Sequence, residues 1–140
     1  MKIEDYKISI VIPTFNRIGS LPRALDSALN QTYQPSEIIV VDNNSYDNTV
    51  DIVSDKYPKV NIISNDENVG FGKAVNQGAK IASGDYFLIL NPDTIIEEDM
   101  INELIEYIES NKNIGMVGPK ILNSDGSLQL SCKRSFPTIK

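Results

Sequence analysis

Four short apolar segments recur along this chain, and each one stops abruptly at polar or turn-forming residues. They are residues 8–13, 37–41, 60–63 and 87–90, and most of their side chains are Ile, Val or Leu. Short runs of this kind predict strands buried in a sheet. Segments with apolar residues at helical spacing separate them. Strands that alternate with helices predict a parallel sheet with right-handed crossovers, so the expected fold class is α/β.

The helices are expected at residues 21–29, 50–57, 74–82 and 100–108, because apolar residues recur there on one face. Ser20 and Asp47 are expected to cap the first two helices, and Gly84 is expected to close the third. Later in the chain, Ile114–Gly118 is predicted to be a fifth strand. Residues 121–130 are predicted to form a hairpin with Asp125-Gly126 at its turn.

The fourth apolar run, Phe87–Leu90, is expected to be a central strand buried on both faces. Pro92 cannot donate to a strand ladder and therefore ends the run. Asp93 is then delivered to the C-terminal edge of the sheet, where open α/β sheets bind ligands. The alternative is that Asp93 only caps the helix that starts near Glu97.

If the sheet is parallel, four polar loops open on this one edge: residues 14–17, 42–45, 65–70 and 91–94. Neighbouring strands lie ~4.8 Å apart, so two steps along the sheet cover roughly 10 Å. This is about the distance from a nucleobase to a diphosphate. One edge could therefore hold a base near Asp42 and phosphates near Asp93.

Charge and composition exclude several classes of function. The net charge is −6 and the isoelectric point is about 4.6, which argues against a nucleic-acid partner. The sequence has no His, so Ser-His-Asp catalysis, Cys-His catalysis and His-ligated zinc are excluded. Cys132 is the only cysteine, which rules out an internal disulfide framework and fits a reducing, cytoplasmic location. No apolar run approaches the ~20 residues that span a bilayer.

An acidic chain that binds phosphates needs a cation. A single carboxylate such as Asp93 can hold Mg²⁺ or Mn²⁺ when substrate phosphates complete the coordination. Residues 68–73 place two glycines at the start of a helix, which is a weak phosphate cradle. Lys73 could meet a phosphate there, or it could be an ordinary solvated lysine. Asp42 could likewise be a turn residue, and Cys132 an idle thiol.

Four stretches, in this order, resemble the serial motifs of family-2 inverting glycosyltransferases, and together they cover nearly the whole chain. The resemblance is carried by residues 10–17 (IVIPTFNR), 40–49 (VVDNNSYDNT), 68–71 (NVGF) with 76–78 (NQG), and 90–93 (LNPD). It implies one glycosyltransferase domain of the GT-A type over residues 1–140, truncated at its C-terminus. The donor would be a nucleoside-diphosphate sugar.

The resemblance also implies roles for individual residues. Asp93 would occupy the metal-binding end of the Asp-x-Asp motif of the family. This chain departs from the motif, because Asn91 stands in place of its first acid. The Asn-Pro-Asp form is similar to that of rhamnosyltransferase-like members, which favours a deoxythymidine-diphosphate rhamnose donor over a uridine-diphosphate one. The residues expected to bind substrate are Pro13, Thr14, Asn16, Arg17, Asp42, Asn44, Asn68, Gly70, Lys73, Asn91 and Asp93.

The implied reaction is a single displacement with inversion, in which an acceptor hydroxyl attacks the anomeric carbon. Asp125 is better explained by the hairpin turn, so the general base is expected beyond Lys140, and these residues alone are expected to transfer sugar poorly. The acceptor would be a saccharide or a lipid-linked saccharide in cell-surface polysaccharide synthesis. The full-length protein would then work in the cytoplasm, with peripheral association at the inner face of the membrane as a further expectation.

Three other readings remain open. The chain could be a module that binds a nucleotide sugar without catalysis. It could be a flavodoxin-like phosphoacceptor domain, although Pro13-Thr14-Phe15-Asn16 stands where that class has an acidic pair. It could also be a nucleotidyltransferase, but that class needs a glycine-rich loop directly after the first strand, and this sequence has none there.

Overall fold

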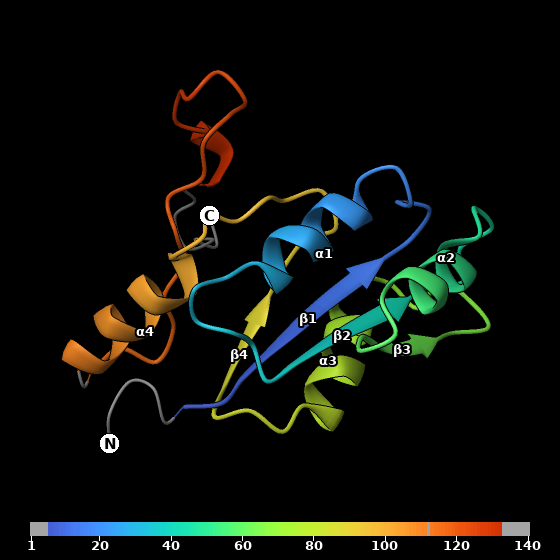
Figure 1. Cartoon of the computed structure of the whole chain (residues 1–140), viewed down its shortest axis with the longest axis horizontal. Helices are drawn as coiled ribbons and strands as arrows, with labels where there is room; N and C mark the ends of the chain where they lie inside the picture. Colours follow the sequence, from blue (N-terminus) through green and yellow to red (C-terminus); the bar gives the residue numbers. More distant parts are fainter. Residues whose placement is uncertain (1–5, 112, 133–140) are drawn as a thin grey trace, which may run out of the picture. The chain divides into compact units, whose positions relative to one another are not determined.

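The computed structural model describes residues 6–111 and 113–132, in which four strands alternate with four α-helices (Figure 1). The strands are β1 (Ile8–Thr14), β2 (Glu37–Asp42), β3 (Asn61–Ser64) and β4 (Tyr86–Ile89). The helices are α1 (Leu21–Leu29), α2 (Thr49–Lys56), α3 (Phe71–Ile81) and α4 (Met100–Ser110), and a short 3-10 helix, η2 (Leu130–Cys132), follows. The expected alternation is confirmed. The chain divides into two compact units, Met1–Glu103 and Leu104–Lys140.

The four strands form one parallel sheet in the order β3-β2-β1-β4. The register pairs Thr14 with Asp42 and Asp42 with Ser64, so the last residues of β1, β2 and β3 lie side by side. On the other side of β1, Val11 pairs with Ile89 of β4. The C-terminal ends of all four strands therefore share one edge, as the sequence pattern predicts.

Helices cover both faces of the sheet. Going from β1 to β3 the chain moves one way across the sheet, and it reverses on the way to β4. Right-handed crossovers then place α3 opposite α1 and α2, which Figure 1 shows. Ala74 of α3 packs against Val11, Ile39 and Val41, and all four are fully buried. This cluster holds α3 firmly on the strands that end at the candidate site.

Strand β4 differs from its expectation. It lies at an edge of the sheet in the described residues, and the exposed fractions of Phe87 and Ile89 are 55% and 43%. These two residues pair in register with Ser9 and Val11, whereas α3 packs on β1 and β2. The prediction of a central strand buried on both faces is therefore wrong for the described residues. An apolar run identifies a strand but not its place in a sheet.

The three predicted helix caps also differ from the structure in part. Helix α3 ends at Ile81 with Ala82 as its C-cap, so Gly84 does not close it. A Cβ at Gly84 would lie 2.7 Å from the Ser9 nitrogen, so this glycine instead permits a close approach to β1. Ser20 occupies the N-cap position of α1 but makes no capping hydrogen bond with its side chain. The N-cap of α2 is Asn48, not Asp47.

In the second unit, residues 113–118 form no strand within the described part of the chain, so the predicted fifth strand is wrong. A strand needs a ladder partner, and no partner pairs with this segment in residues 6–111 and 113–132. The predicted hairpin is confirmed by an antiparallel bridge between Leu122 and Leu128. Its last residue differs, because Leu130 begins η2.

The longest helices, α3 and α4, have 11 residues each. No helix within the described ranges is thus long and apolar enough to span a bilayer.

Candidate functional site

Two buried polar groups lie next to each other at the C-terminal edge of the sheet. Thr14 ends β1 and Asp42 ends β2, and the register makes them neighbours. Their exposed fractions are 3% and 1%. Neither Thr14 Oγ1 nor Asp42 Oδ1 has a hydrogen-bond partner among the residues that the structure describes. Leaving a buried polar group unpaired costs about 1–3 kcal/mol, so this pair indicates a site for a polar ligand.

The second oxygen of Asp42 is already engaged. Asp42 Oδ2 accepts a hydrogen bond from the Ser45 backbone nitrogen at 2.9 Å, which fixes the orientation of the carboxylate. Asp42 is thus a turn residue through one oxygen and a candidate ligand group through the other. The two readings of Asp42 from the sequence are therefore compatible.

The loops that follow β1 and β2 are tied together by hydrogen bonds. The Asn16 nitrogen donates to Ser45 Oγ at 2.8 Å, and the Tyr46 nitrogen donates to Asn16 Oδ1 at 2.9 Å. The ring of Phe15 meets that of Tyr46 edge to face, with centroids 6.2 Å apart. Both rings are exposed, so they form an aromatic rim beside the buried pair of Thr14 and Asp42.

Asn residues make these tight loops possible. Asn16, Asn44 and Asn48 have φ angles of 51°, 63° and 59°, in the left-handed region. Asn tolerates this region better than most residues because its side chain bonds locally to the backbone. The motif residues Asn16 and Asn44 therefore shape the loops, and Asn44 is exposed at the rim.

Asp47 links the same two loops, although the sequence indicated only a helix-start residue. Its carboxylate accepts hydrogen bonds from the Ile18 nitrogen at 3.0 Å and from the Thr49 hydroxyl. Burial by itself would raise the pKa of Asp47, but these hydrogen bonds outweigh it and the pKa is lowered. The N-cap position of α2 is held by Asn48, and Asp47 lies one residue before it. Ser45 and Asp47 are contributors that sequence reasoning missed, and their only signal was their place in a polar loop.

A network of side-chain amides connects the third loop to this edge. Asn65 Nδ2 donates to Asn43 Oδ1 at 3.0 Å and to Gln77 Oε1 at 2.9 Å. Gln77 Nε2 donates in return to Asn65 Oδ1 at 2.8 Å. The Asn43 nitrogen also donates to the Thr14 carbonyl, at 2.9 Å. Helix α3 is thereby fixed to the loop that carries Asp42.

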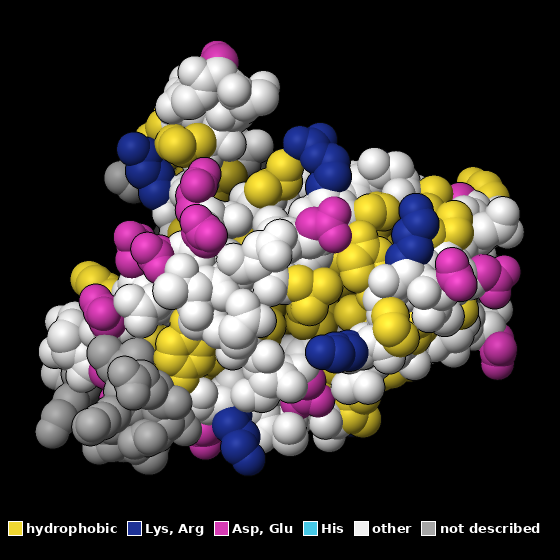
Figure 2. Space-filling view, viewed as in Figure 1, with side chains coloured by type: hydrophobic (Ala, Val, Ile, Leu, Met, Phe, Trp, Pro, Cys, Tyr) yellow, Lys and Arg dark blue, Asp and Glu magenta, His cyan; other side chains and the backbone are white. Residues whose placement is uncertain are grey.

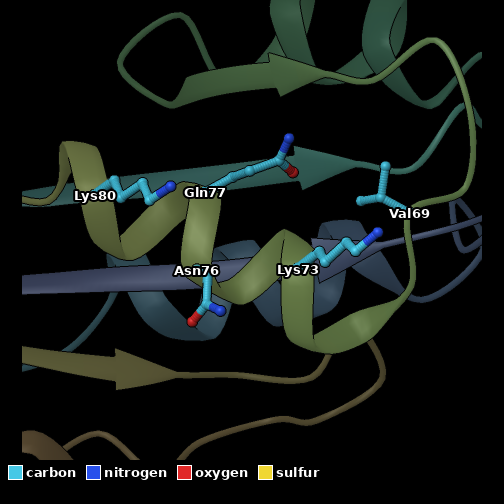
Figure 3. A pocket seen from close by; sticks show the side chains of 5 residues that line it. All are labelled: Val69, Lys73, Asn76, Gln77 and Lys80. Carbon is cyan, nitrogen blue, oxygen red and sulfur yellow. The ribbon is translucent and has the colours of Figure 1, made fainter.

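The predicted phosphate cradle lies at the start of α3. Asn68 Oδ1 accepts a hydrogen bond from the Gly70 nitrogen at 3.0 Å, and Gly70 has a φ of 83°. Lys73 lines an adjacent pocket of about 270 Å³ together with four other residues: Val69, Asn76, Gln77 and Lys80. Figure 3 shows Lys73, Gln77 and Lys80 on successive turns of α3, with Asn76 directed away from Gln77. Lys73 is exposed at this pocket, where it could reach a bound anion.

Asp93 lies on the turn that leaves β4. The Leu90 nitrogen donates to the Val11 carbonyl at 3.0 Å, and the Thr94 nitrogen donates to the Asn91 carbonyl at 3.2 Å. Helix α4 begins only at Met100, so the alternative that Asp93 caps this helix is wrong.

Asn91 and Asp93 are both exposed. The described residues contain no group of three or more His, Cys, Asp or Glu side chains that could hold a metal ion. Asp93 therefore fits a divalent ion only if ligand oxygens complete the coordination.

The remaining predicted residues also lie at this edge of the sheet. Pro13 is buried in β1, paired in register with Val41. Arg17 is exposed, and its carbonyl accepts the Ser20 and Leu21 nitrogens at 3.0 and 2.8 Å. Figure 2 shows Lys and Arg side chains lying singly on the viewed face rather than in a continuous patch.

These features define an α/β domain with a candidate site for a polar ligand at the C-terminal edge of a parallel sheet. Residues 9–132 match the model of glycosyl transferase family 2, and the chain belongs to this family. The GT-A fold expected from the sequence is confirmed, because the similar solved structures are glycosyltransferases.

Three similar proteins illustrate the relationship. The poly-beta-1,6-N-acetyl-D-glucosamine synthase of Staphylococcus epidermidis is 32% identical over 86% of this chain and 30% of its own length. The structure of S. aureus TarS 1-349 in complex with UDP-GlcNAc has a TM-score of 0.68 and 28% identity, covering 76% of this chain and 32% of that one. The mannosyltransferase PcManGT from Pyrobaculum calidifontis, in complex with GDP-Man and Mn²⁺, has a TM-score of 0.66 at 22% identity. It covers 74% of this chain and 32% of that one, and it shows the shared fold.

The chain spans 35–40% of the length of three curated glycosyltransferases that it matches.

Proposed function

We propose that this chain is the donor-binding part of an inverting glycosyltransferase that takes its sugar from a nucleoside diphosphate. The observation that supports this most directly is the buried, unpaired couple of Thr14 Oγ1 and Asp42 Oδ1. Both atoms lie at the edge where α/β sheets bind nucleotides. The similar TarS structure is in complex with UDP-GlcNAc, a nucleoside-diphosphate sugar.

The chemistry of the couple limits the base. A carboxylate oxygen only accepts hydrogen bonds, whereas a Thr hydroxyl also donates them. A base that fits must offer a donor beside an acceptor, and uracil, thymine and guanine do so with a ring N–H beside a carbonyl. Within this set we propose a thymidine or uridine donor, with dTDP-rhamnose as one candidate because of the Asn91-Pro92-Asp93 sequence.

The diphosphate would lie between this couple and the turn after β4. Asp93 would hold Mg²⁺ or Mn²⁺ together with phosphate oxygens, and the ion, when bound, supplies positive charge to the leaving diphosphate. Asn91 would add a neutral polar group, and Arg17 and Lys73 would add cationic ones. Strands β2 and β4 are two steps apart in the sheet, with β1 between them. Two steps cover roughly 10 Å, which is the distance expected between the base and the diphosphate.

Neither Asp47 nor Asp125 suits the role of the general base that would accept the proton of the attacking hydroxyl. Asp47 is committed to Ile18 and Thr49, and Asp125 accepts two hydrogen bonds from Ser127. We propose that the base and the acceptor site belong to further sequence of a longer protein. The similar proteins support this, because this chain covers only part of their length. The acceptor would then be a saccharide or lipid-linked saccharide of the cell surface.

The test is calorimetric titration with UDP, dTDP and GDP, with and without Mn²⁺, on the wild type and two variants. Asp42→Asn should weaken the best nucleotide about tenfold in both conditions, since ~1.4 kcal/mol corresponds to one charge-assisted hydrogen bond. Asp93→Asn should remove only the gain in affinity that Mn²⁺ gives. Asp55→Asn, on the exposed surface of α2, is the matched control and should bind like the wild type. Unchanged affinity in both site variants would exclude the assignment.

A further inference from the structure

A buried glutamine outside the candidate site holds the segment that follows Asp93. Gln31 lies just after α1 and only 1% of it is exposed. Its Nε2 donates to the Glu97 carbonyl at 2.7 Å and to the Ser27 carbonyl at 3.2 Å. Its Oε1 accepts from the Ile101 nitrogen at 3.1 Å. Every polar atom of this side chain is therefore paired, two of the partners being about 70 residues away along the chain.

The bond to Ile101 satisfies a backbone nitrogen in the first turn of α4. Ile101 is the second residue of α4, and its nitrogen is one that the helix itself cannot pair. A side chain at the N-cap usually provides the acceptor, but here Gln31 provides it from another element. Gln31 therefore fixes where α4 starts.

Two more bonds join the same segment to the end of α1. The Ile96 nitrogen donates to Ser27 Oγ at 3.2 Å, and the Thr32 nitrogen donates to the Glu98 carbonyl at 2.8 Å. Ser27 Oγ in turn donates to the Ala24 carbonyl at 2.9 Å, so the hydroxyl is held in place. Residues 96–101 are thus fastened to α1 along their length.

Asp93 lies between two anchors. Strand β4 and the Asn91–Thr94 turn hold the chain before and around it, and the bond from Ile96 to Ser27 holds the chain three residues later. Helix α1 also supports the Arg17 loop at its other end, where the Leu21 nitrogen donates to the Arg17 carbonyl. One helix therefore helps to position two loops that carry predicted substrate-binding residues.

We propose that Ser27 and Gln31 are positioning residues for Asp93, and that they control the metal-dependent part of nucleoside-diphosphate binding. This proposal rests on the proposed function. The bonds that they make fix the path of residues 96–101, and hence the distance from the Asp93 carboxylate to the couple of Thr14 and Asp42. In the described residues, the hydrogen-bond partners of the Ser27 and Gln31 side chains all lie outside the couple of Thr14 and Asp42, so the binding of the base should be unchanged in their variants.

The experiment measures the affinities of UDP and dTDP by calorimetry, with and without Mn²⁺, in Ser27→Ala and Gln31→Met. Each variant removes hydrogen bonds and keeps a side chain of similar or smaller size. The gain that Mn²⁺ gives should fall about tenfold, as when a group that orients a metal ligand is removed. The affinity without Mn²⁺ should stay within about twofold of the wild type. This split between the two conditions is not expected from a general loss of stability.

Two further variants sharpen the result. Ser27→Thr keeps the hydroxyl and should keep the Mn²⁺ gain. Ser54→Ala, exposed on α2, matches the chemical change of Ser27→Ala and should behave like the wild type. If Gln31→Met does not fold, the Ser27 series alone decides.

The outcomes separate the two proposals. A wild type that binds neither nucleotide, or gains nothing from Mn²⁺, overturns the proposed function and with it this inference. If Mn²⁺ raises the affinity of the wild type and Ser27→Ala keeps the full gain, only the inference is overturned. Equal losses with and without Mn²⁺ would show a purely structural role and would also overturn it.

Discussion

At the scale of single residues, one carboxylate shows how the two kinds of role combine. Asp42 fixes its own loop through Oδ2, while Oδ1 is buried beside Thr14 and has no hydrogen-bond partner in residues 6–111 and 113–132. The sequence placed both residues at strand ends. It could not show that the register of β1 and β2 makes them neighbours, nor that one oxygen stays free. Those facts depend on the pairing of segments 28 residues apart.

A second carboxylate lies at the opposite end of β2. Glu37 Oε1 accepts hydrogen bonds from the Ser9 hydroxyl at 2.6 Å, the Ser83 nitrogen at 2.7 Å and the Ser83 hydroxyl at 2.8 Å. These bonds favour the charged form, and they lower the pKa of Glu37 from its ordinary value of 4.5. The carboxylate connects β1, β2 and the segment that precedes β4.

We predict that Glu37 makes stability depend on pH in the acid range. Since its pKa is lower in the folded state than in the unfolded state, its contribution is complete above pH 4.5 and is lost as the pH falls through the folded value. Urea unfolding should show wild type more stable than Glu37→Gln near neutral pH. The difference should shrink below pH 4.5. A difference that stays constant from neutral pH into the acid range would contradict this prediction.

At the scale of elements, α3 depends on a glycine that the sequence did not explain. A Cβ at Gly78 would lie 2.4 Å from Val11 Cγ1 and 3.3 Å from Val41 Cγ2. Both valines are fully buried and cannot move away freely. Gly78 therefore allows the helix to approach the two strands that end at the candidate site.

We predict opposite effects for two glycines of this helix. Gly78→Ala should lower the free energy of unfolding by about 1–2 kcal/mol, because overpacking costs ~1–3 kcal/mol and helix propensity returns up to ~1 kcal/mol. Gly72→Ala meets nothing within 4 Å and should be neutral or slightly stabilising. Urea unfolding of the two variants tests this. Equal effects would mean that the close contact at Gly78 is relieved without cost.

Strand β4 shows that an apolar sequence pattern predicts a strand but not its burial. Its composition predicts a strand correctly, and the strand is observed at Tyr86–Ile89. Its burial is lower than expected because it pairs with β1 on one side only in the described residues. Asp93 still follows the strand at the expected edge of the sheet, because the parallel direction of β4, and not its burial, determines at which edge it ends.

At the scale of the whole chain, the two compact units differ in burial. In the first unit, every residue of β1 is buried, and so are all residues of β2 except Glu37. In the described residues that follow α4, most side chains are exposed, including those of Met116 at 87% and Leu130 at 80%. Stability should therefore be concentrated in the first unit.

We predict that amide hydrogen exchange will divide the chain accordingly. The amides of Ile10–Ile12 and Ile38–Val41 are paired in the sheet and lie among buried side chains, so they should be the slowest to exchange. Amides of residues 113–132 should exchange much faster. Mass spectrometry of peptic fragments resolves the two regions. Similar protection in both regions would show that the second unit is stabilised to the same extent as the first.

The sequence by itself determined the order of strands and helices, the parallel direction of the sheet and the polar residues at its C-terminal edge. Local propensity and apolar periodicity are enough for this, because each element carries its own pattern. Only the tertiary structure decided which polar atoms stay unpaired, which strand is at the edge, and that Gln31 pairs with a backbone nitrogen of α4. These features depend on contacts between segments that are distant in the sequence. Packing and strand register determine such contacts, and no local sequence pattern encodes them.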